Sequence, residues 1–565
     1  MKTTRLLATM LASTAAVLAL TSCDASTPKS NASFSVVGAS IPEMQAAMAE
    51  GRTTSREIVT QYLTRIGLYE DKLNGANAIN ANALAQAEAL DKERAAGNIR
   101  GPLHGIPVAL KDNIMTKDDM PTSGGMLAFK HYMAPYDATL VTKLKDAGAI
   151  IIAKSTLSEL AGWFGSDFRP GGYNAAAGQS YNPYDPRAND NGTPVLAVAG
   201  SSSGIGVAAD MWAGNVGTST AGSIEGPSNA NMLVGIRPST GRISRHGIIP
   251  LTLDQDTAGP MTKTVAGAAI MLGVMEGEPD SNDPRTTECE APPYHDYTPF
   301  LKTDALKGVR IGIPRTGLYE PYEFPGLAEP FSGLEPDEAQ SMEDAIAAMR
   351  AAGAEIVDPA DLPSMTATDP ADNIMTRNIC QLAPDGEAPD DLCSNVLRYG
   401  MKRDFNLWLE SLGDTAPIKT LTELRAWNSE HEADGAIRYG QGRLDAADAV
   451  DLEKDKARYE LNRAEDLQLA RAEGLDAVLT EHNLDALVFP GTSGSNISAR
   501  AGYPVVVVPF GMVINDAPGA NGSEEKTRPY GFSFVGGHCQ DPKIIGIAYA
   551  FEQATKKRVP PPHTP

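Results

Sequence analysis

Apolar residues recur along this chain in two patterns, one typical of helices and one typical of buried strands. Helical spacing is found at residues 53–66, 80–95, 137–146, 336–352, 421–481 and 544–554. Short apolar runs without a helical period are found at residues 106–111, 149–154, 309–314, 486–489, 505–508 and 532–535. The first of these predicted strands ends in Lys111. At residues 53–57 the Thr/Ser and Glu spacing predicts a capped helix start.

The region between these elements is rich in Gly, Ser and Asn. Residues 170–204 have no regular period and predict irregular structure. Residues 207–212 have a short helical pattern, and residues 214–226 form a second Gly/Ser/Thr stretch that we interpret as a loop. Two Gly/Ser loops are therefore expected on either side of one short helix.

Strands that alternate with helices predict an α/β fold. The length of 565 residues would by itself suggest several average domains. Because no linker is evident after Ser33, we expect one large domain over residues 34–565.

The charge of the chain excludes one class of partner. The sequence has 48 Lys and Arg against 71 Asp and Glu, a net charge of −23. A nucleic-acid-binding protein needs a basic surface to neutralise phosphates, so no nucleic-acid partner is expected. An acidic surface otherwise serves solubility.

The N-terminus has the layout of an export signal. Two basic residues precede an apolar stretch at residues 6–20, which is too short and too rich in Ala and Thr to span a membrane. We expect residues 1–22 to be a signal peptide and residues 23–33 a flexible tether.

The end of this signal resembles that of bacterial lipoproteins, in which small residues precede a lipidated cysteine. Here that residue is Cys23, and Asp24 favours retention at the inner membrane. Several acyl chains on Cys23 would anchor the protein firmly. Cleavage of an ordinary signal near Cys23 is the alternative.

Four further cysteines remain, and an exported protein can pair them. They are Cys289, Cys380, Cys393 and Cys539. Cys380 and Cys393 are the favoured pair, although four cysteines allow three connectivities. Since no His/Cys cluster has metal-ligand spacing, no metal is expected.

Two Gly/Ser segments are the candidates for chemistry. Residues 199–204 are Ala-Gly-Ser-Ser-Ser-Gly, and residues 217–224 are Gly-Thr-Ser-Thr-Ala-Gly-Ser-Ile. Glycine lets the backbone approach a reacting group and aim N–H donors at it, and serine hydroxyls can attack or relay protons. The segments lack the Gly-Lys-Thr ending of a nucleotide-binding loop. Ordinary Ser/Gly turns are the alternative on composition alone.

The order of motifs along the chain resembles the amidase signature family of serine hydrolases. Besides the Ser-rich segment 199–204, the matching motifs are Gly-Pro-Leu-His-Gly-Ile-Pro (101–107), Lys-Asp-Asn (111–113), Ala-Gly-Ala-Ile (147–150), Lys-Ser (154–155), Gly-Ser-Ile (222–224), Gly-Ile-Arg-Pro-Ser (235–239), Gly-Arg-Ile-Ser (241–244), Asp-Thr-Ala-Gly-Pro-Met (256–261), Ala-Gly-Tyr-Pro (501–504), Gly-Phe-Ser-Phe-Val-Gly (531–536) and Ala-Phe-Glu-Gln-Ala (550–554). Such order over most of the chain is highly specific. The resemblance implies a large mixed β-sheet with helices on both faces.

The resemblance also assigns catalytic roles. The strand-end lysine of the family falls on Lys111, the first serine of the Ser-rich loop, held in a cis peptide, on Ser201, and the nucleophile on Ser223. Ser202 is a supporting residue and the alternative to Ser201. The backbone N–H groups that stabilise the oxyanion belong to Thr220, Ala221, Gly222 and Ser223. No cofactor is implied.

This assignment is consistent with the chemistry of the groups. A serine hydroxyl needs a base, and a lysine can act as one only when it is neutral, a state that burial favours. None of the eight histidines is needed as the base, and His104 and His246 are interpreted as structural. A Ser/His/Asp triad is the alternative, but neither loop contains a Gly-x-Ser-x-Gly elbow.

Three positions near the nucleophile depart from the usual form of the family. Ser219 replaces a common acidic residue, Glu225 replaces a frequent Arg, and Ala221 stands where Gly or Asp is usual. The chain is also slightly short between the two serine loops. The electrostatics of the nucleophile loop are therefore altered, while all three catalytic side chains remain.

The motifs resemble peptide amidases and general amidases more than the glutamine-using amidotransferase subunit. Peptide C-terminal, aryl, fatty and small amides are all candidate substrates. A divergent region at about residues 280–481 is expected to form part of the pocket wall. The alternatives are a catalytically silent, membrane-tethered binding protein on the same fold and an amidotransferase-type subunit. The sequence does not indicate an oligomeric state.

Overall fold

The computed structural model describes residues 34–165, 170–189, 191–198, 203–324, 331, 333–379, 394–515 and 527–565. The predicted signal peptide, Cys23 and the tether lie outside these ranges, as do Ser201, Ser202, Cys380 and Cys393. Within them, no helix has both the length and the apolar character that crossing a membrane requires.

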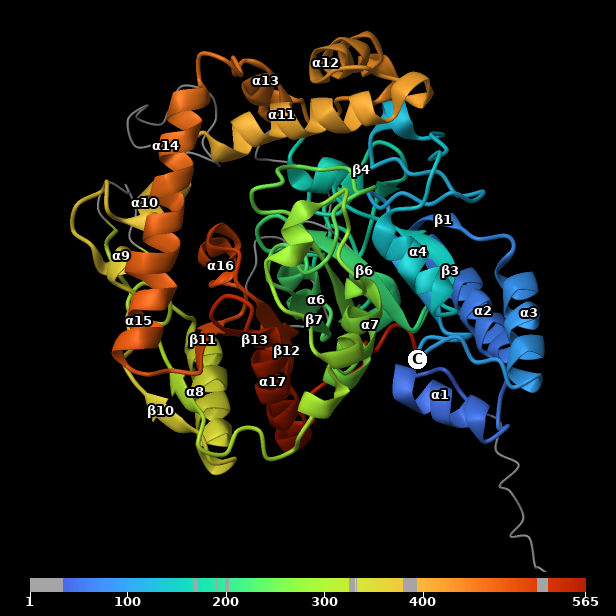
Figure 1. Cartoon of the computed structure of the whole chain (residues 1–565), viewed down its shortest axis with the longest axis horizontal. Helices are drawn as coiled ribbons and strands as arrows, with labels where there is room; N and C mark the ends of the chain where they lie inside the picture. Colours follow the sequence, from blue (N-terminus) through green and yellow to red (C-terminus); the bar gives the residue numbers. More distant parts are fainter. Residues whose placement is uncertain are drawn as a thin grey trace, which may run out of the picture.

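An eleven-stranded sheet runs through the middle of the protein in the order β1-β3-β2-β6-β8-β7-β12-β13-β11-β9-β10 (Figure 1). Its strands are β1 (Ala76–Ile79), β2 (Pro107–Lys111), β3 (Ile150–Ser155), β6 (Gly214–Ser219), β7 (Val234–Arg237), β8 (Thr257–Thr262), β9 (Arg310–Gly312), β10 (Glu355–Val357), β11 (Ala486–Pro490), β12 (Val505–Ile514) and β13 (Thr527–Val535). Parallel pairs such as β2–β3 and β2–β6 stand beside antiparallel pairs such as β6–β8 and β12–β13. The sheet is therefore mixed, as the resemblance implied. A separate hairpin pairs β4 (Tyr173–Asn174) with β5 (Gly178–Gln179).

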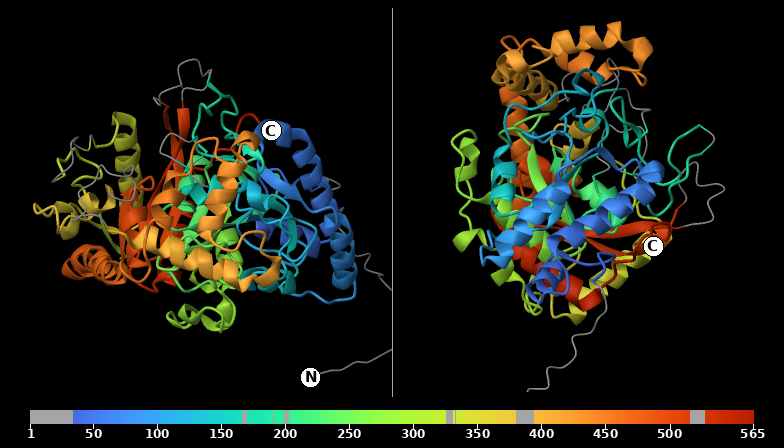
Figure 2. Two further views of the ribbon diagram at one scale, coloured as in Figure 1. Left: turned by 90° about the horizontal axis from the view of Figure 1, so that it is seen from above. Right: turned by 90° about the vertical axis from the view of Figure 1, so that its right-hand side faces the viewer.

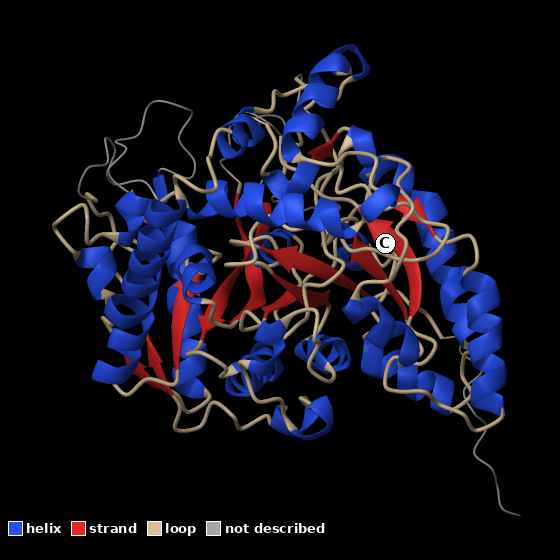
Figure 3. Ribbon diagram, turned by 45° about the horizontal axis from the view of Figure 1, so that its top comes forward, coloured by secondary structure: helices blue, strands red, loops and turns tan. Residues whose placement is uncertain are grey.

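Helices cover both faces of this sheet (Figure 3). They are α1 (Ile41–Ala49), α2 (Ser55–Leu73), α3 (Ala83–Ala95), α4 (Thr139–Asp146), α5 (Ile205–Ala208), α6 (Glu225–Ala230), α7 (Val265–Glu276), α8 (Pro336–Ala351), α9 (Pro363–Thr366), α10 (Ile374–Ile379), α11 (Val396–Ser411), α12 (Leu421–Glu430), α13 (Gly442–Asp448), α14 (Lys456–Leu467), α15 (Asp476–Glu481), α16 (Ser495–Ala501) and α17 (Asp541–Thr555). The α/β class with helices on both faces is confirmed.

Most of the predicted elements are present. Helix α2 begins with the expected capping box, in which the Thr54 side chain accepts from the Glu57 N–H and the Glu57 side chain accepts from the Thr54 N–H. Strand β2 is fully buried and ends at Lys111, as the apolar run predicted. The helix predicted at residues 207–212 is shorter and earlier, at α5.

The prediction of a loop over residues 214–219 was wrong, because these residues form β6 in the middle of the sheet. Their small side chains reflect close packing on both faces. A Cβ atom on Gly214 would lie 2.5 Å from Met271 of α7, and one on Gly217 would lie 2.7 Å from Met261. A buried central strand needs no polar alternation, so composition alone made this segment look like a loop.

A second hydrophobic core lies away from the sheet. It consists of the apolar faces of α11, α12 and α13 and of segments near residues 115–164 and 249–251. These three helices cross the top of the molecule in Figure 1 and lie at the top of the right-hand view in Figure 2. Trp408 of α11 packs on Phe129 with ring centroids 5.6 Å apart. The helices of residues 396–448 are therefore packed onto the loops at one edge of the sheet.

A disulfide joins Cys289 to Cys539, which are 250 residues apart in sequence. This pairing is one of the three connectivities that four cysteines allow. The predicted Cys380–Cys393 pair is compatible with it but lies outside the described ranges, so it stays a prediction.

Candidate active site

The candidate site lies where two neighbouring parallel strands end. Strand β2 pairs with β6 in parallel, so Lys111 at the end of β2 and the loop that follows Ser219 at the end of β6 lie at the same sheet edge. Strand β8 pairs with the other side of β6, with Thr257 opposite Ser219. Ser223 lies in the loop between β6 and α6 and is half-buried. The sheet order thus brings together residues that are far apart in sequence.

Lys111 is fully buried, and its side-chain nitrogen, Nζ, is hydrogen-bonded to Thr218 on β6. Lys111 Nζ donates to the Thr218 carbonyl oxygen at 3.2 Å and lies 2.9 Å from Thr218 Oγ1. Burial lowers the pKa of Lys111 from 10.5 to about 7, although the nearby Asp256 carboxylate acts in the opposite direction. A substantial fraction of this lysine is therefore neutral near pH 7, as a general base requires.

The loop that carries Ser223 turns back on the end of β6. Ser219 Oγ accepts from the N–H groups of Gly222 and Ser223, each at 3.0 Å. An N–H that is engaged in this way donates less well to a second acceptor. Of the four predicted oxyanion-hole donors, Thr220 and Ala221 are therefore the stronger candidates, and the oxyanion hole stays a prediction. Ser201 and Ser202 lie outside the described residues, so the proton relay also stays a prediction.

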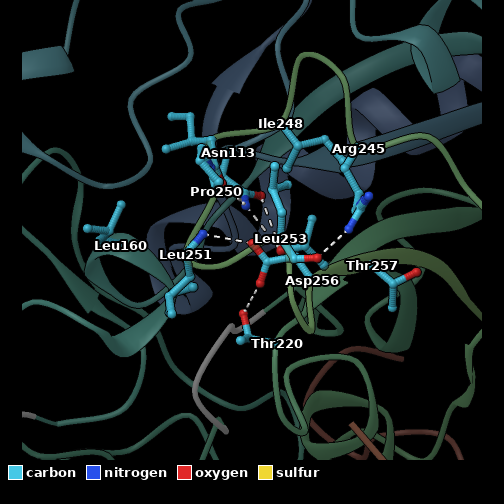
Figure 4. Close-up of a pocket in the computed structure, with 13 residues that line it drawn as sticks. Asn113, Leu160, Thr220, Arg245, Ile248, Pro250, Leu251, Leu253, Asp256 and Thr257 are labelled. Atoms are coloured by element: carbon cyan, nitrogen blue, oxygen red, sulfur yellow. Dashed lines mark hydrogen bonds between the residues drawn. The ribbon is translucent and has the colours of Figure 1, made fainter. Parts of the chain in front are cut away.

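A small pocket of about 20 Å³ adjoins Thr218 and the loop that carries Ser223 (Figure 4). Its apolar wall consists of Leu160, Ala161, Ile248, Ile249, Pro250, Leu251 and Leu253. Its polar lining consists of Asn113, Thr218, Thr220, Arg245, Asp256 and Thr257. Leu160, Ile249 and Leu251 also belong to the second core, so α11–α13 support this wall from behind.

Two charged groups line the pocket, and both are already engaged. The Arg245 guanidinium donates to both carboxylate oxygens of Asp283, at 2.7 and 2.5 Å, and to the Leu253 carbonyl. Asp256 accepts from Thr220 Oγ1 at 2.5 Å and from the Leu251 N–H at 2.8 Å (Figure 4). It also accepts from the Thr252 N–H at 3.0 Å. Neither is a free counter-ion, so the pocket suits an uncharged, apolar group.

Asp256 couples the nucleophile loop to the pocket wall. Burial raises the pKa of Asp256 from 3.8 to about 6, against the opposite effect of the hydrogen bond from Thr220. The position of Asp256 next to the loop that carries Ser223 depends on the β6–β8 register, which no local pattern encodes.

The two motif histidines lie in structural environments. His104 is buried, with Nε2 2.9 Å from the Leu90 carbonyl oxygen and Nδ1 accepting from the Arg100 N–H. His246 stacks on Tyr136 with ring centroids 5.0 Å apart. These contacts favour the structural interpretation of both histidines.

The region at residues 280–481 meets the pocket indirectly. The lining residues of this pocket lie between residues 113 and 257. Asp404 of α11 accepts from the Leu253 N–H at 2.7 Å, and Asp283 holds Arg245. Through these two contacts the divergent region positions residues that line the pocket. A part of the pocket wall formed by other residues of this region stays a prediction.

One group in the described part of the chain has the residue types of a metal site, namely Cys289, His538 and Cys539. Because the two sulfur atoms are bonded to each other, neither is a thiolate ligand in this state. The group therefore gives no support for a resident metal.

The sequence profile of the amidase family matches residues 57–502. The chain belongs to the amidase signature family. It is 32% identical over 534 residues to a probable amidase of Arabidopsis thaliana, covering 94% of this chain and 93% of the relative. It is also 29% identical over 534 residues to a glutamyl-tRNA(Gln) amidotransferase subunit from Thermosynechococcus vestitus, covering 91% and 98%.

Solved structures lead to the same family. Native peptide amidase from Stenotrophomonas maltophilia is 34% identical and matches with a TM-score of 0.77, covering 92% of this chain and 98% of that one. A peptide amidase in complex with the competitive inhibitor chymostatin is 34% identical with a TM-score of 0.79, covering 94% and 100%. The family and these neighbours support amide hydrolysis as the reaction of this chain.

Proposed function

We propose that the chain hydrolyses carboxamides through an acyl-enzyme on Ser223, with Lys111 as the base that acts through Ser201. The observation that carries this proposal is the buried Lys111 beside β6, whose pKa is lowered to about 7. Among the described residues, the hydrogen bonds of Lys111 Nζ go to Thr218 alone, with no carboxylate hydrogen-bonded to it, and Thr218 lies on the strand that leads into the loop of Ser223. A neutral amine in that place can accept a proton at neutral pH.

The proposed reaction has two steps. The Ser223 hydroxyl attacks the amide carbonyl, its proton passes through Ser201 to Lys111, and the C–N bond breaks as the same proton returns to the leaving amine. Water then attacks the ester by the reverse relay, which releases the carboxylic acid and restores the Ser223 hydroxyl. Backbone N–H groups of the Ser223 loop stabilise the oxyanion in both steps.

The apolar pocket wall favours substrates with an apolar acyl side, and similarity to the 34% identical peptide amidase adds peptide amides as a class. We infer that C-terminal amides of peptides ending in an apolar residue are better substrates than glutamine. Because the chain is also similar to an amidotransferase subunit, glutamine is the substrate with which these peptide amides are to be compared.

Ammonia release from N-acetyl-leucinamide, N-acetyl-phenylalaninamide, benzamide and glutamine tests the substrate proposal. Hydroxylamine in the assay captures an acyl-enzyme as the hydroxamate, so hydroxamate is expected in place of part of the acid. Ser223→Ala should lose both products, whereas Ser364→Ala, which removes a buried hydroxyl on α9, should keep them. Ammonia release without hydroxamate would contradict the acyl-enzyme, and a preference for glutamine would favour the amidotransferase alternative.

We also propose that the protein is exported and anchored through a lipid on Cys23, as the motif at residues 20–23 suggests. The full chain expressed in a bacterium should incorporate labelled palmitate and sediment with membranes, and Cys23→Ser should do neither. A Cys23→Ser variant that is still processed and released would instead indicate an ordinary signal peptide.

A further inference from the structure

The loop that carries Ser223 is held from inside by one hydroxyl. Ser219 Oγ accepts from the N–H groups of Gly222 and Ser223, each at 3.0 Å. The Ser219 hydroxyl itself donates to Glu225 Oε2 at 3.0 Å, and the same oxygen accepts from the Ile224 N–H at 3.2 Å. The turn from Ser219 to Glu225 is thus one hydrogen-bonded unit with the nucleophile inside it.

The carboxylate at the end of this chain of hydrogen bonds is completely buried. Glu225 is 0% exposed, and its other oxygen, Oε1, lies 3.9 Å from Nε of the equally buried Arg237 on β7. Arg237 also donates to the carbonyl oxygens of Tyr503 and Gln255, at 3.1 and 2.9 Å. A buried charge is tolerated only beside an opposite charge or hydrogen-bond partners, so the pair ties the nucleophile loop to the sheet.

We propose that Ser219 and Glu225 are positioning residues that fix the Ser223 loop for attack, with Arg237 as the compensating charge. This inference rests on the proposed role of Ser223. A hydroxyl that donates to a carboxylate is a stronger acceptor for the two backbone N–H groups, because hydrogen bonds in a chain polarise one another. Rotation of the peptide units around Gly222 would break these bonds, so they hold the main chain in one orientation.

The proposal also explains the departure from the usual family residues. Related sequences commonly have an acidic residue at position 219 and often an Arg at 225. In this chain the carboxylate stands at position 225 and acts through the hydroxyl at 219, while Arg237 of β7 provides the positive charge. The altered loop therefore retains a carboxylate, in a different place.

The first test removes the hydroxyl. Ser219→Ala should lower kcat about 10- to 100-fold, at or below the lower end of the loss seen when an oxyanion-hole donor is removed, with little change in KM. The rate at which a fluorophosphonate labels Ser223 should fall in parallel. Ser364→Ala, which also removes a hydroxyl that is 1% exposed, serves as the matched control. A Ser219→Ala enzyme with undiminished kcat and labelling rate would overturn the inference while leaving the proposed function intact.

The second test moves the carboxylate. Ser219→Asp alone puts two carboxylates side by side and should be nearly inactive, since like charges in a buried site repel. The double variant Ser219→Asp/Glu225→Gln has a single carboxylate again and should recover at least about 10-fold of the lost kcat. A double variant no more active than Ser219→Asp would overturn the inference. Undiminished hydrolysis by Ser223→Ala would overturn the proposed function, and this inference with it.

Discussion

The burial of Lys111 predicts a specific coupling between activity, stability and pH. With a pKa of about 7 in place of 10.5, about half of Lys111 is neutral at pH 7, whereas an ordinary lysine would be neutral in about 1 molecule in 3,000. The same difference corresponds to about 5 kcal/mol of folding free energy that the buried ammonium costs below pH 7. The site therefore has a base near neutrality at the expense of stability.

The direction of the stability change follows from proton counting. Between about pH 7 and pH 10.5 the folded protein binds fewer protons at Lys111 than the unfolded chain, so the free energy of unfolding rises with pH in this window. In Lys111→Met this contribution is absent. From about pH 6 to about pH 9 the wild-type protein should gain about 3 kcal/mol relative to Lys111→Met.

Two measurements check this prediction. Urea unfolding of both proteins at the two pH values gives the difference in free energy, in which other titrating groups largely cancel. The rate of fluorophosphonate labelling at Ser223 should rise tenfold per pH unit and level off above about pH 7 in the wild type. Lys111→Met should label about 10²- to 10⁴-fold more slowly. A pH-independent stability difference, or normal labelling of Lys111→Met, would refute the assignment of Lys111 as a buried base.

Three further predictions concern the surroundings of the site. Because burial raises the pKa of Asp256 to about 6, between about pH 4 and pH 6 the folded protein holds a proton on Asp256 that the unfolded chain has lost. The free energy of unfolding of the wild type, measured in urea, should therefore fall by about 3 kcal/mol relative to Asp256→Asn as the pH rises across that window. Leu251→Ala should cost about 2–5 kcal/mol and lower kcat/KM for N-acetyl-leucinamide more than for a bulkier aryl amide, because it removes part of the buried pocket wall. Reduction of the Cys289–Cys539 disulfide should destabilise the fold by up to about 5 kcal/mol, because it closes a loop of 250 residues, and a thermal melt with and without dithiothreitol measures the change.

Each of these has its own control. Asp254→Asn removes a neighbouring carboxylate outside the pocket lining, and the same pH trend in that variant would contradict the role given to Asp256. An equal loss for all amides in Leu251→Ala would indicate a purely structural residue. A Cys289→Ser variant that melts at the wild-type temperature and no longer responds to dithiothreitol would contradict the stabilising role of the disulfide.

Local patterns predicted much of the fold. The capped start of α2, the apolar run of β2 and the four-valine start of β12 depend on neighbouring residues only, so they are visible in the sequence. The roles of Lys111 and Ser223 were assigned through the resemblance to the family, and they stay predictions. The identity of β6 was missed because its Gly, Thr and Ser residues are small for packing reasons, which composition cannot distinguish from a loop.

The sequence by itself predicted the α/β class, most of the elements and, through the family resemblance, Lys111 and Ser223 as the candidate base and nucleophile. Only the tertiary structure decided which groups stand beside them. Lys111 meets Thr218 across 107 residues, Thr220 meets Asp256 across 36, and Glu225 at the start of α6 faces Arg237 of β7. These contacts depend on sheet order and register, which many distant residues set together. The pKa of Lys111, the apolar pocket and the carboxylate that acts through Ser219 all follow from them.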